Sequence, residues 1–236
     1  MPMTLPEVMT ELEALGSEQT RKTWRNHGAP EPMFGVKIGD LKTILKKTKT
    51  DPALAEQLWA TGNTDAQYLA ALMCDPKRFT PGDLDRWMEG ATWYMLAEYS
   101  VAWVAGESGH GWTCGTRWIE DPRETVAVGG WATLACHVIA TDDAKLDVAA
   151  IDALLERVRR EIHGERNYVR YTMNGFVIAV GGYVAPCAAH AKEVANAIGE
   201  VKVDMGGTSC KVPYAPDYIE KTLARGPVQK RKKLRC

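Results

Sequence analysis

One segment in the middle of the chain combines a single carboxylate with aromatic rings. Residues 90–106 contain one charged residue, Glu98, which is preceded by Trp93 and Tyr94. No glycine or proline interrupts residues 91–105, and alanine, leucine and methionine favour helix, so we predict a helix there. In such a helix Tyr94 and Glu98 lie one turn apart on the same face, where an acid and an aromatic ring could act together.

The Glu98 carboxylate has two interpretations. A charged carboxylate is costly to bury unless it is paired, hydrogen-bonded or neutralised. Glu98 is therefore either an acid on the exposed stripe of a core helix, bonded to a neighbouring arginine, or an acid placed between aromatic walls. A perturbed carboxyl group in the second environment would indicate a functional site. The residues themselves leave both interpretations open.

Positive charge is concentrated near the two ends of a chain whose net charge is −1. Residues 21–49 carry eight Lys or Arg against two acids, a balance of +6, and residues 230–236 carry +5. Residues 50–229 carry −8. Basic clusters suit a phosphate backbone, and a disordered basic tail would add non-specific affinity for DNA. Solvated helix faces and a solubilising tail are the alternative.

Four basic residues are candidates for phosphate contacts. Lys42 and Lys46 lie one turn apart on an amphipathic segment, away from its apolar face. Arg170 follows several arginines that could equally pair with neighbouring glutamates on a helix surface. Lys211 ends the segment Gly206-Gly-Thr-Ser-Cys-Lys211, whose backbone N–H groups and hydroxyls suit a phosphate. Because that segment lacks the spacing of a Walker motif, an ordinary connecting turn is the alternative.

Helix-capping signals recur along the chain and predict an all-α protein. Asp-Pro or Thr-Pro pairs occupy residues 51–52, 75–76, 80–81 and 121–122, and each joins a capping side chain to a proline suited to the first helical turn. About a dozen short helices with short connections follow, and no run alternates as a strand does. Stacked helix pairs of uneven length indicate a HEAT-like solenoid, and a compact bundle without a groove is the alternative.

Two β-branched segments, residues 126–131 and 176–183, contain paired glycines and could be buried strands. We predict helices instead, because both lie inside longer apolar segments without a βαβ rhythm and neither reads GxGxxG. Their near-repeat suggests two helices whose backbones approach closely at the glycines.

Other features of the sequence disfavour several classes of protein. No segment approaches the roughly 18–20 uninterrupted apolar residues of a membrane span, and the first residues do not resemble a secretion signal. The six cysteines are scattered without a CxxC pair, and four metal ligands never occur at recognisable spacing. We therefore expect free thiols, no metal, no small-molecule cofactor, no membrane partner and a cytoplasmic location.

Several short segments resemble those of the DNA alkylation repair family of AlkD-like proteins. They are Met33-Phe-Gly-Val-Lys37, Leu58-Trp59, Leu69-Ala-Ala-Leu72, Asp75-Pro76, Trp93, Asn167-Tyr-Val-Arg170, Asn174-Gly-Phe176 and Thr208-Ser-Cys-Lys211. The resemblance covers about residues 33–235 and consists of many moderate matches. It implies a superhelix of HEAT-like repeats whose concave, basic face holds duplex DNA.

The resemblance also implies a chemistry. Characterised glycosylases of this family excise cationic alkylated purines, such as 3-methyladenine and 7-methylguanine, without a metal. They use a groove Asp flanked by tryptophans and supported by an Arg. A cationic base is already a good leaving group, so the enzyme mainly supplies a carboxylate near the developing oxocarbenium ion and aromatic faces for the base and sugar.

The site residues carried over from the family depart from its pattern. The segment Trp93-Tyr-Met-Leu-Ala-Glu98 matches the family's Trp-Trp-Asp-x-x-Asp-like helix, which puts Glu98 in the place of the catalytic Asp and Tyr94 in that of one stacking Trp. Phe176 falls near the second stacking Trp. No Arg occurs where the supporting Arg is expected, and the nearest is Arg123. A carboxylate moved by one methylene is enough to misplace a catalytic group.

The sequence therefore predicts a single HEAT-like solenoid domain over residues 1–228, followed by a basic, disordered tail over residues 229–236. We expect a monomer that binds duplex DNA, including alkylated DNA, through a concave basic groove, associates with the nucleoid when bound, and excises cationic alkylated purines with Trp93, Tyr94 and Glu98. Lys42, Lys46, Arg170, Phe176 and Lys211 are the predicted DNA contacts. A non-catalytic DNA-binding or damage-recognition module and a protein–protein scaffold are the alternatives.

Overall fold

The computed structural model describes residues 3–226 and 229–235, and within these ranges no residue lies in a strand. The helices are α1 (Leu5–Leu15), α2 (Glu18–Asn26), α3 (Ile38–Thr48), α4 (Pro52–Ala60), α5 (Thr64–Met73), η1 (Pro76–Arg78), α6 (Pro81–Gly90), α7 (Tyr94–Leu96), η2 (Ala97–Val101), α8 (Ala102–Ser108), α9 (Gly111–Trp118), α10 (Glu124–Ala140), η3 (Asp143–Lys145), α11 (Val148–Glu161), η4 (Ile162–Gly164), α12 (Asn167–Tyr183), η5 (Ala185–Cys187), α13 (Ala188–Ile198) and α14 (Ala215–Leu223). The all-α prediction is confirmed.

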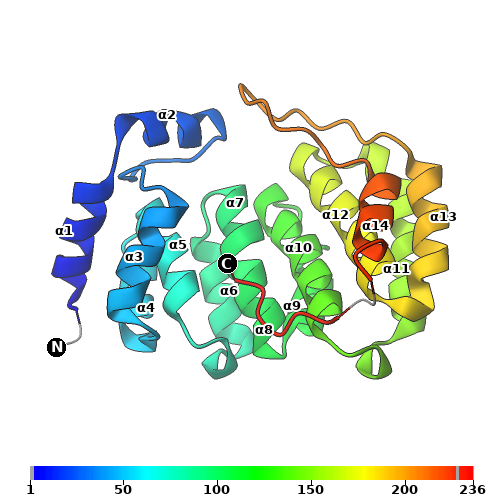
Figure 1. Cartoon of the computed structure of the whole chain (residues 1–236), viewed down its shortest axis with the longest axis horizontal. Helices are drawn as coiled ribbons and strands as arrows, with labels where there is room; N and C mark the ends of the chain where they lie inside the picture. The colour runs from blue at the N-terminus through cyan, green and yellow to red at the C-terminus, as the bar shows by residue number, and fades with distance from the viewer. Residues whose placement is uncertain (1–2, 227–228, 236) are drawn as a thin grey trace.

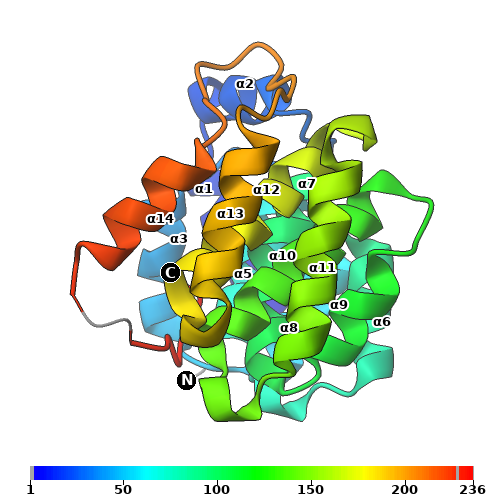
Figure 2. The same ribbon diagram turned by 90° about the vertical axis from the view of Figure 1, so that its right-hand side faces the viewer.

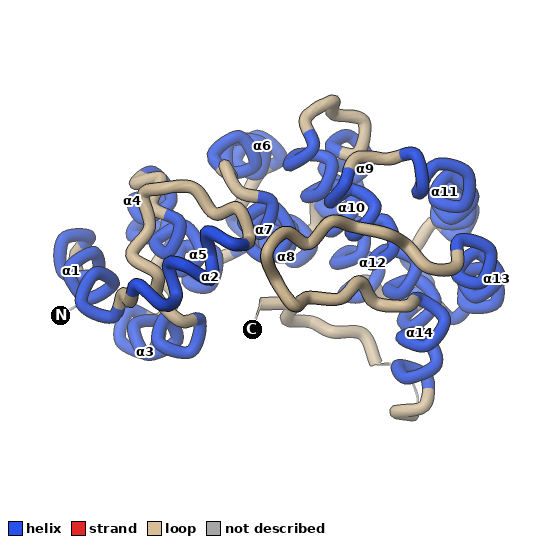
Figure 3. The backbone as a smooth tube through the Cα atoms, turned by 90° about the horizontal axis from the view of Figure 1, so that it is seen from above, coloured by secondary structure: helices blue, strands red, loops and turns tan. Residues whose placement is uncertain are grey.

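The helices stack side by side into a curved arch (Figure 1). Seen from above, α4, α6, α9, α11 and α13 form the outer row, and α3, α5, α8, α10, α12 and α14 form the inner row (Figure 3). The inner row faces the concave side, with α3 near one end and α14 at the other. One apolar core runs through the whole arch, because each helix buries its apolar face against the next pair.

The capping signals read from the sequence act as expected at several helix starts. The Asp51 side chain accepts a hydrogen bond from the Leu54 N–H at the start of α4, at 3.0 Å. Thr80 and Asp83 form a reciprocal capping box at the start of α6. At residues 121–122 the outcome differs, since α10 begins only at Glu124. There Asp121 accepts from the Arg123 N–H, and it forms a turn before the helix.

Both segments with paired glycines are helical, as predicted, and lie in α10 and α12. The glycine pairs do not meet each other, however. A Cβ on Gly130 would stand 2.6 Å from the Ile119 nitrogen, directly after α9. A Cβ on Gly181 would stand 2.6 Å from the Ile219 side chain of α14. The glycines thus allow close packing on two different neighbours.

The basic segment after α14 makes contacts that its composition does not indicate. The structure places residues 229–235 along the concave side of the arch, where the segment runs from α14 towards its middle (Figures 1 and 3). Lys230 donates hydrogen bonds to the Val138 and Tyr183 carbonyls. Arg235 forms an ion pair with Glu107 at 3.0 Å. These contacts join residues more than 40 positions apart, which local composition does not indicate.

No single helix among the described residues is long and apolar enough to cross a membrane. One bent pair, Asn167–Tyr183 with Ala185–Ile198, passes the same test of length and composition, with an angle of 110° between its two helices.

A buried carboxylate fixes the loop that leads into α3. Asp65 is fully buried at the start of α5 and accepts hydrogen bonds from the Phe34, Gly35 and Val36 N–H groups at 2.6, 3.1 and 2.7 Å. Burial raises the pKa of the Asp65 carboxyl, and the three N–H donors oppose that shift by stabilising its charged form. The loop between α2 and α3 is thereby held against the arch.

We predict that Asp65→Ala lowers the free energy of unfolding by about 3 kcal/mol, because three backbone N–H groups lose their acceptor in a buried site. Asp65→Asn should lose less, since it keeps one oxygen acceptor. Urea unfolding checks both, with the exposed Glu193→Ala as the control. A loss no larger for Asp65→Ala than for Glu193→Ala would show that the carboxylate does not hold this loop.

Candidate nucleic-acid interface

The central segment is not one continuous α-helix. Residues 91–93 lie outside the helix, and the helical part consists of α7, the π-helical turn η2 and α8. This corrects the predicted helix over residues 91–105. A π-turn holds more residues per turn than an α-helix and frequently marks a functional site. Glu98 lies in this turn.

Tyrosine side chains surround Glu98. The residue as a whole is partly exposed. Burial of its carboxyl raises the pKa to about 7, and a hydrogen bond with Tyr99 acts against that rise. The pKa of the Tyr171 hydroxyl is raised by burial and by the nearby Glu98 charge. Burial and the same charge raise the pKa of the Cys136 thiol to about 12. Glu98 therefore faces α10 and α12 as well as its own helix.

Among the described residues, no Lys, Arg or His lies within 4.0 Å of the Glu98 carboxylate as an ion-pair partner. The interpretation in which a neighbouring arginine binds Glu98 is thus not what the structure shows. Arg123, the arginine nearest in sequence to the expected supporting position, pairs instead with Glu89 at 2.6 Å and with Asp121 at 2.7 Å.

Trp93 and Tyr94 are covered by other parts of the protein. The Trp93 indole N–H donates to the His27 carbonyl at 2.8 Å, and its ring packs against Trp24 with centroids 5.6 Å apart. Tyr94 stacks on Tyr168 with ring centroids 3.8 Å apart and planes 13° apart. The two rings are 5% and 8% exposed, so in this structure they connect the end of α2 and the start of α12 to the centre of the arch.

Further aromatic rings lie near Glu98 that the sequence did not single out. Trp103 of α8 packs edge-on against Tyr68 of α5 at 5.9 Å and against Tyr99 at 5.8 Å. Trp103 remains partly exposed. Because the π-turn shifts the register after Ala97, a simple 3.6-residue periodicity misplaces the side chains that follow.

Phe176 cannot contact DNA in this conformation, which corrects the prediction for it. The side chain is 0% exposed and packs edge-on against Trp131 with centroids 5.4 Å apart. It belongs to the face of α12 that packs on α10. Matching the family's motif by position identified an aromatic residue at the expected place in the sequence. In the structure, however, that residue lies on the buried face of its helix.

Two predicted phosphate contacts lie on α3, near one end of the arch. Lys46 is exposed and Lys42 is partly exposed. Neither forms an ion pair among the described residues, whereas the adjacent Lys47 binds Glu11 at 2.6 Å. Their charges are therefore available to a ligand.

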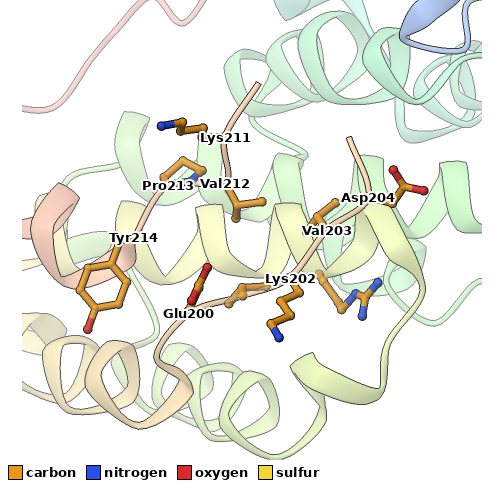
Figure 4. Close-up of a pocket in the computed structure, with 10 residues that line it drawn as sticks. Glu200, Lys202, Val203, Asp204, Lys211, Val212, Pro213 and Tyr214 are labelled. Atoms are coloured by element: carbon orange, nitrogen blue, oxygen red, sulfur yellow. The ribbon is translucent and has the colours of Figure 1, made fainter. Parts of the chain in front are cut away.

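The other two predicted phosphate contacts, Arg170 and Lys211, line one cleft of about 720 Å³ near the other end of the arch. Figure 4 shows that the cleft lies between two extended stretches of the loop over residues 199–214, which bring Lys202 and Lys211 over α12. Glu200 and Asp204 line it too. Sequence reasoning missed Lys202, which alternates with valines in an extended stretch and gives no helical signal.

Side-chain amides of α12 hold this loop in place. The Asn174 amide donates to the Pro213 carbonyl at 2.8 Å. Asn167 donates to the Asp204 carbonyl at 2.7 Å and accepts from the Asp204 N–H at 2.8 Å. Arg170 donates to Asn167 at 3.2 Å, while its Nε is buried without a hydrogen-bond partner among the described residues. The cleft thus contains a guanidinium with unused donor capacity.

The raised pKa of Glu98 leads to a pH prediction. Because the carboxyl has a pKa of about 7 in the folded protein against 4.5 ordinarily, the folded state binds the proton more tightly. Wild-type stability should therefore fall, relative to Glu98→Gln, as the pH rises from 4.5 to about 7, and the difference should then level off. Denaturant titrations of both proteins between pH 4.5 and 8.5 check this, and a constant difference would contradict it.

Comparisons with known proteins agree with the fold and with the resemblance. The family model described as "DNA alkylation repair enzyme" matches residues 8–191. Uncharacterised proteins of Listeria innocua and Listeria monocytogenes are 34% and 33% identical over 229 residues, covering 94% of this chain and 99% of each relative.

A solved structure is similar over 99% of this chain and 100% of its own, with 37% identity and a TM-score of 0.88. It is described as representing "a new family of proteins related to the HEAT-like repeat DNA glycosylases with affinity for branched DNA structures". The HEAT-like prediction is thereby confirmed. Together with the matched family model, these similarities show that the chain belongs to the DNA alkylation repair enzyme family.

Proposed function

We propose that this protein binds branched duplex DNA on the concave side of its arch. The observation that carries the proposal is the presence, towards the two ends of the arch (Figure 3), of cations that form no ion pair with any described residue. Lys42 and Lys46 lie on α3, and Lys202 and Lys211 lie on the loop over α12. Phosphate backbones attract such cations without regard to sequence.

The separation of the two cationic groups favours a branched ligand over a single straight duplex. Between them lie the apolar and tyrosine-rich helices η2 and α8, which themselves contribute Glu98 rather than Lys or Arg, and the basic segment 229–235 runs along the same stretch of the arch (Figure 1). Two duplex arms that diverge from a junction could each meet one cationic group. The affinity for branched DNA in the description of the 37% identical structure supports this choice.

We expect the wild-type protein to bind a four-way junction more tightly than a linear duplex of the same length at low salt. Lys42→Glu/Lys46→Glu should weaken junction binding and lower the slope of log affinity against log salt by about 2, because each lost phosphate contact removes about 0.9. Lys202→Glu/Lys211→Glu should do the same from the other end. Fluorescence anisotropy measures both.

The matched control is Arg160→Glu/Lys192→Glu, which makes the same change in net charge on the outer helices α11 and α13 (Figure 3). Equal weakening by the control would show that only net charge matters. No binding of the wild type to either DNA at low salt would contradict the proposal and favour a protein–protein scaffold.

A second candidate function is excision of a cationic alkylated purine, and the environment of Glu98 favours it. Glu98 is a partly exposed residue with tyrosine rings nearby, so it offers both a negative charge and aromatic faces to a cation. A bound cationic base would lower the pKa of Glu98 and so favour the carboxylate form that stabilises an oxocarbenium ion. Trp93 and Tyr94, which are buried, would act by positioning this turn.

If this second function holds, Glu98→Gln should abolish release of alkylpurine from methylated DNA while leaving DNA affinity equal or slightly higher, because it removes one negative charge. Glu98→Asp should retain activity or raise it. Chromatography of the released bases gives the readout. Excision that survives Glu98→Gln unchanged excludes this residue from the chemistry, and a wild type that releases no base leaves DNA binding alone as the function.

A further inference from the structure

The basic segment 229–235 lies along the concave side of the arch (Figure 1) and contains both partly buried and exposed residues. Lys230, Leu234 and Arg235 are at least partly buried, whereas the residues between them are exposed. We call residues 230–235 the strap, because it is attached near both of its ends.

The first attachment is Lys230, whose side chain is 15% exposed. Its ammonium group donates to the Val138 carbonyl at 2.9 Å and to the Tyr183 carbonyl at 2.6 Å, and it pairs with Asp143 at 2.6 Å. Those carbonyls lie at the C-terminal ends of α10 and α12, where helix dipoles favour a positive charge.

The second attachment is Arg235. Its guanidinium pairs with Glu107 at 3.0 Å, and both side chains are 10% exposed. It also donates to the Ala71 and Cys74 carbonyls at 3.0 and 2.9 Å, at the end of α5. The other carboxylate oxygen of Glu107 accepts from the Leu234 and Arg235 N–H groups at 2.7 and 3.1 Å.

Leu234 adds an apolar contact to this attachment. It packs with Trp103 against a small cluster of Ala102, Ala132 and Cys136, which belongs to α8 and α10. Gly106 makes room for it, because a Cβ there would stand 2.9 Å from the Leu234 side chain. The strap therefore fits a complementary site on the inner row of helices.

Three consecutive cations lie between the attachments. Arg231 lies over the Tyr183 ring, 5.4 Å from its centroid, and its N–H donates to the Ile139 carbonyl at 3.0 Å. Lys232 and Lys233 are exposed and have no hydrogen bond or ion pair to any described residue. The attachments thus hold the backbone that carries these two lysines against the inner row of helices.

We propose that the attached strap is a DNA-binding element, in which Lys232 and Lys233, flanked by Arg231, contact phosphates in the groove. This inference rests on the proposed DNA-binding function and assigns it a third group of contacts, between the two ends of the arch. Fixed cations lose less conformational entropy on binding than a free tail does, so attachment increases their contribution to affinity.

The decisive variant is Glu107→Gln, because attachment and net charge predict opposite results. Replacing a carboxylate by an amide makes the protein more positive, so a free basic tail would bind DNA equally well or better. If attachment is required, junction affinity should instead fall by about threefold to tenfold, which corresponds to the roughly 0.5–1.5 kcal/mol needed to order a long side chain on binding. Leu234→Ser, which changes no charge, should weaken binding in the same way.

Lys232→Ala/Lys233→Ala tests the contacts themselves. It should lower the slope of log affinity against log salt by about 2, at about 0.9 for each phosphate. The matched control, Arg160→Ala/Lys192→Ala on α11 and α13, removes the same charge from the outer helices and should have little effect. Thermal unfolding of each variant verifies that the arch itself is intact.

Three results would overturn the proposal. Unchanged or tighter binding by both Glu107→Gln and Leu234→Ser would show that the tail acts as a free polycation or obstructs the groove. A slope unchanged by Lys232→Ala/Lys233→Ala would show that these lysines do not meet phosphates. A wild type that fails to bind any DNA would refute the proposed function itself, which the variants alone cannot do, so the two failures are distinguishable.

Discussion

The burial of helix α10 on almost every side is the constraint on which the arch depends. Of its described residues, Val126–Leu134 are all buried, so the helix lacks a polar face wide enough to be stable in water. It lies against α8 and α12 in the inner row and α9 in the outer row. The close approach of α9 requires Gly130, where any Cβ would collide with backbone atoms. No neighbouring pair of helices could be removed without exposing this apolar surface.

That constraint leaves little room for charge at the centre, and the two acids beside α10 are accommodated differently. Glu107 is buried with Arg235 and accepts two backbone N–H groups, so its charge is paired. Glu98 has tyrosines around it instead, and burial raises its pKa to about 7. Glu98 lies within the π-turn, which changes the helical register of the residues that follow it, including Glu107.

The fold was largely predictable, because capping residues and apolar periodicity are local signals, and even the β-branched segments of α10 and α12 were correctly predicted as helices. The features that could not be predicted are those that depend on contacts between residues far apart in the sequence. Phe176 was placed at the groove by matching its position to a stacking Trp of the family, and such a match does not tell which face of a doubly buried helix meets which neighbour. The strap was expected to be disordered because its composition is basic, yet Glu107, over 120 residues earlier, binds it. The cleft beside Arg170 also depends on long-range hydrogen bonds from Asn167 and Asn174.

The same long-range contacts determine the electrostatics, which a net charge of −1 conceals. Cations come from three distant parts of the chain: α3 towards one end of the arch, the loop over residues 199–214 towards the other end, and the strap along the concave side (Figures 1 and 3). Glu98 would oppose a polyanion there only while it is ionised. A phosphate backbone nearby favours the protonated form, so the pKa of Glu98, already about 7, would rise further on DNA binding. The carboxyl could then bind a proton and no longer repel the phosphates. A cationic base would have the opposite effect, because it favours the deprotonated carboxylate. A single acid with a pKa near neutrality is thus compatible with both DNA binding and the recognition of a positively charged lesion.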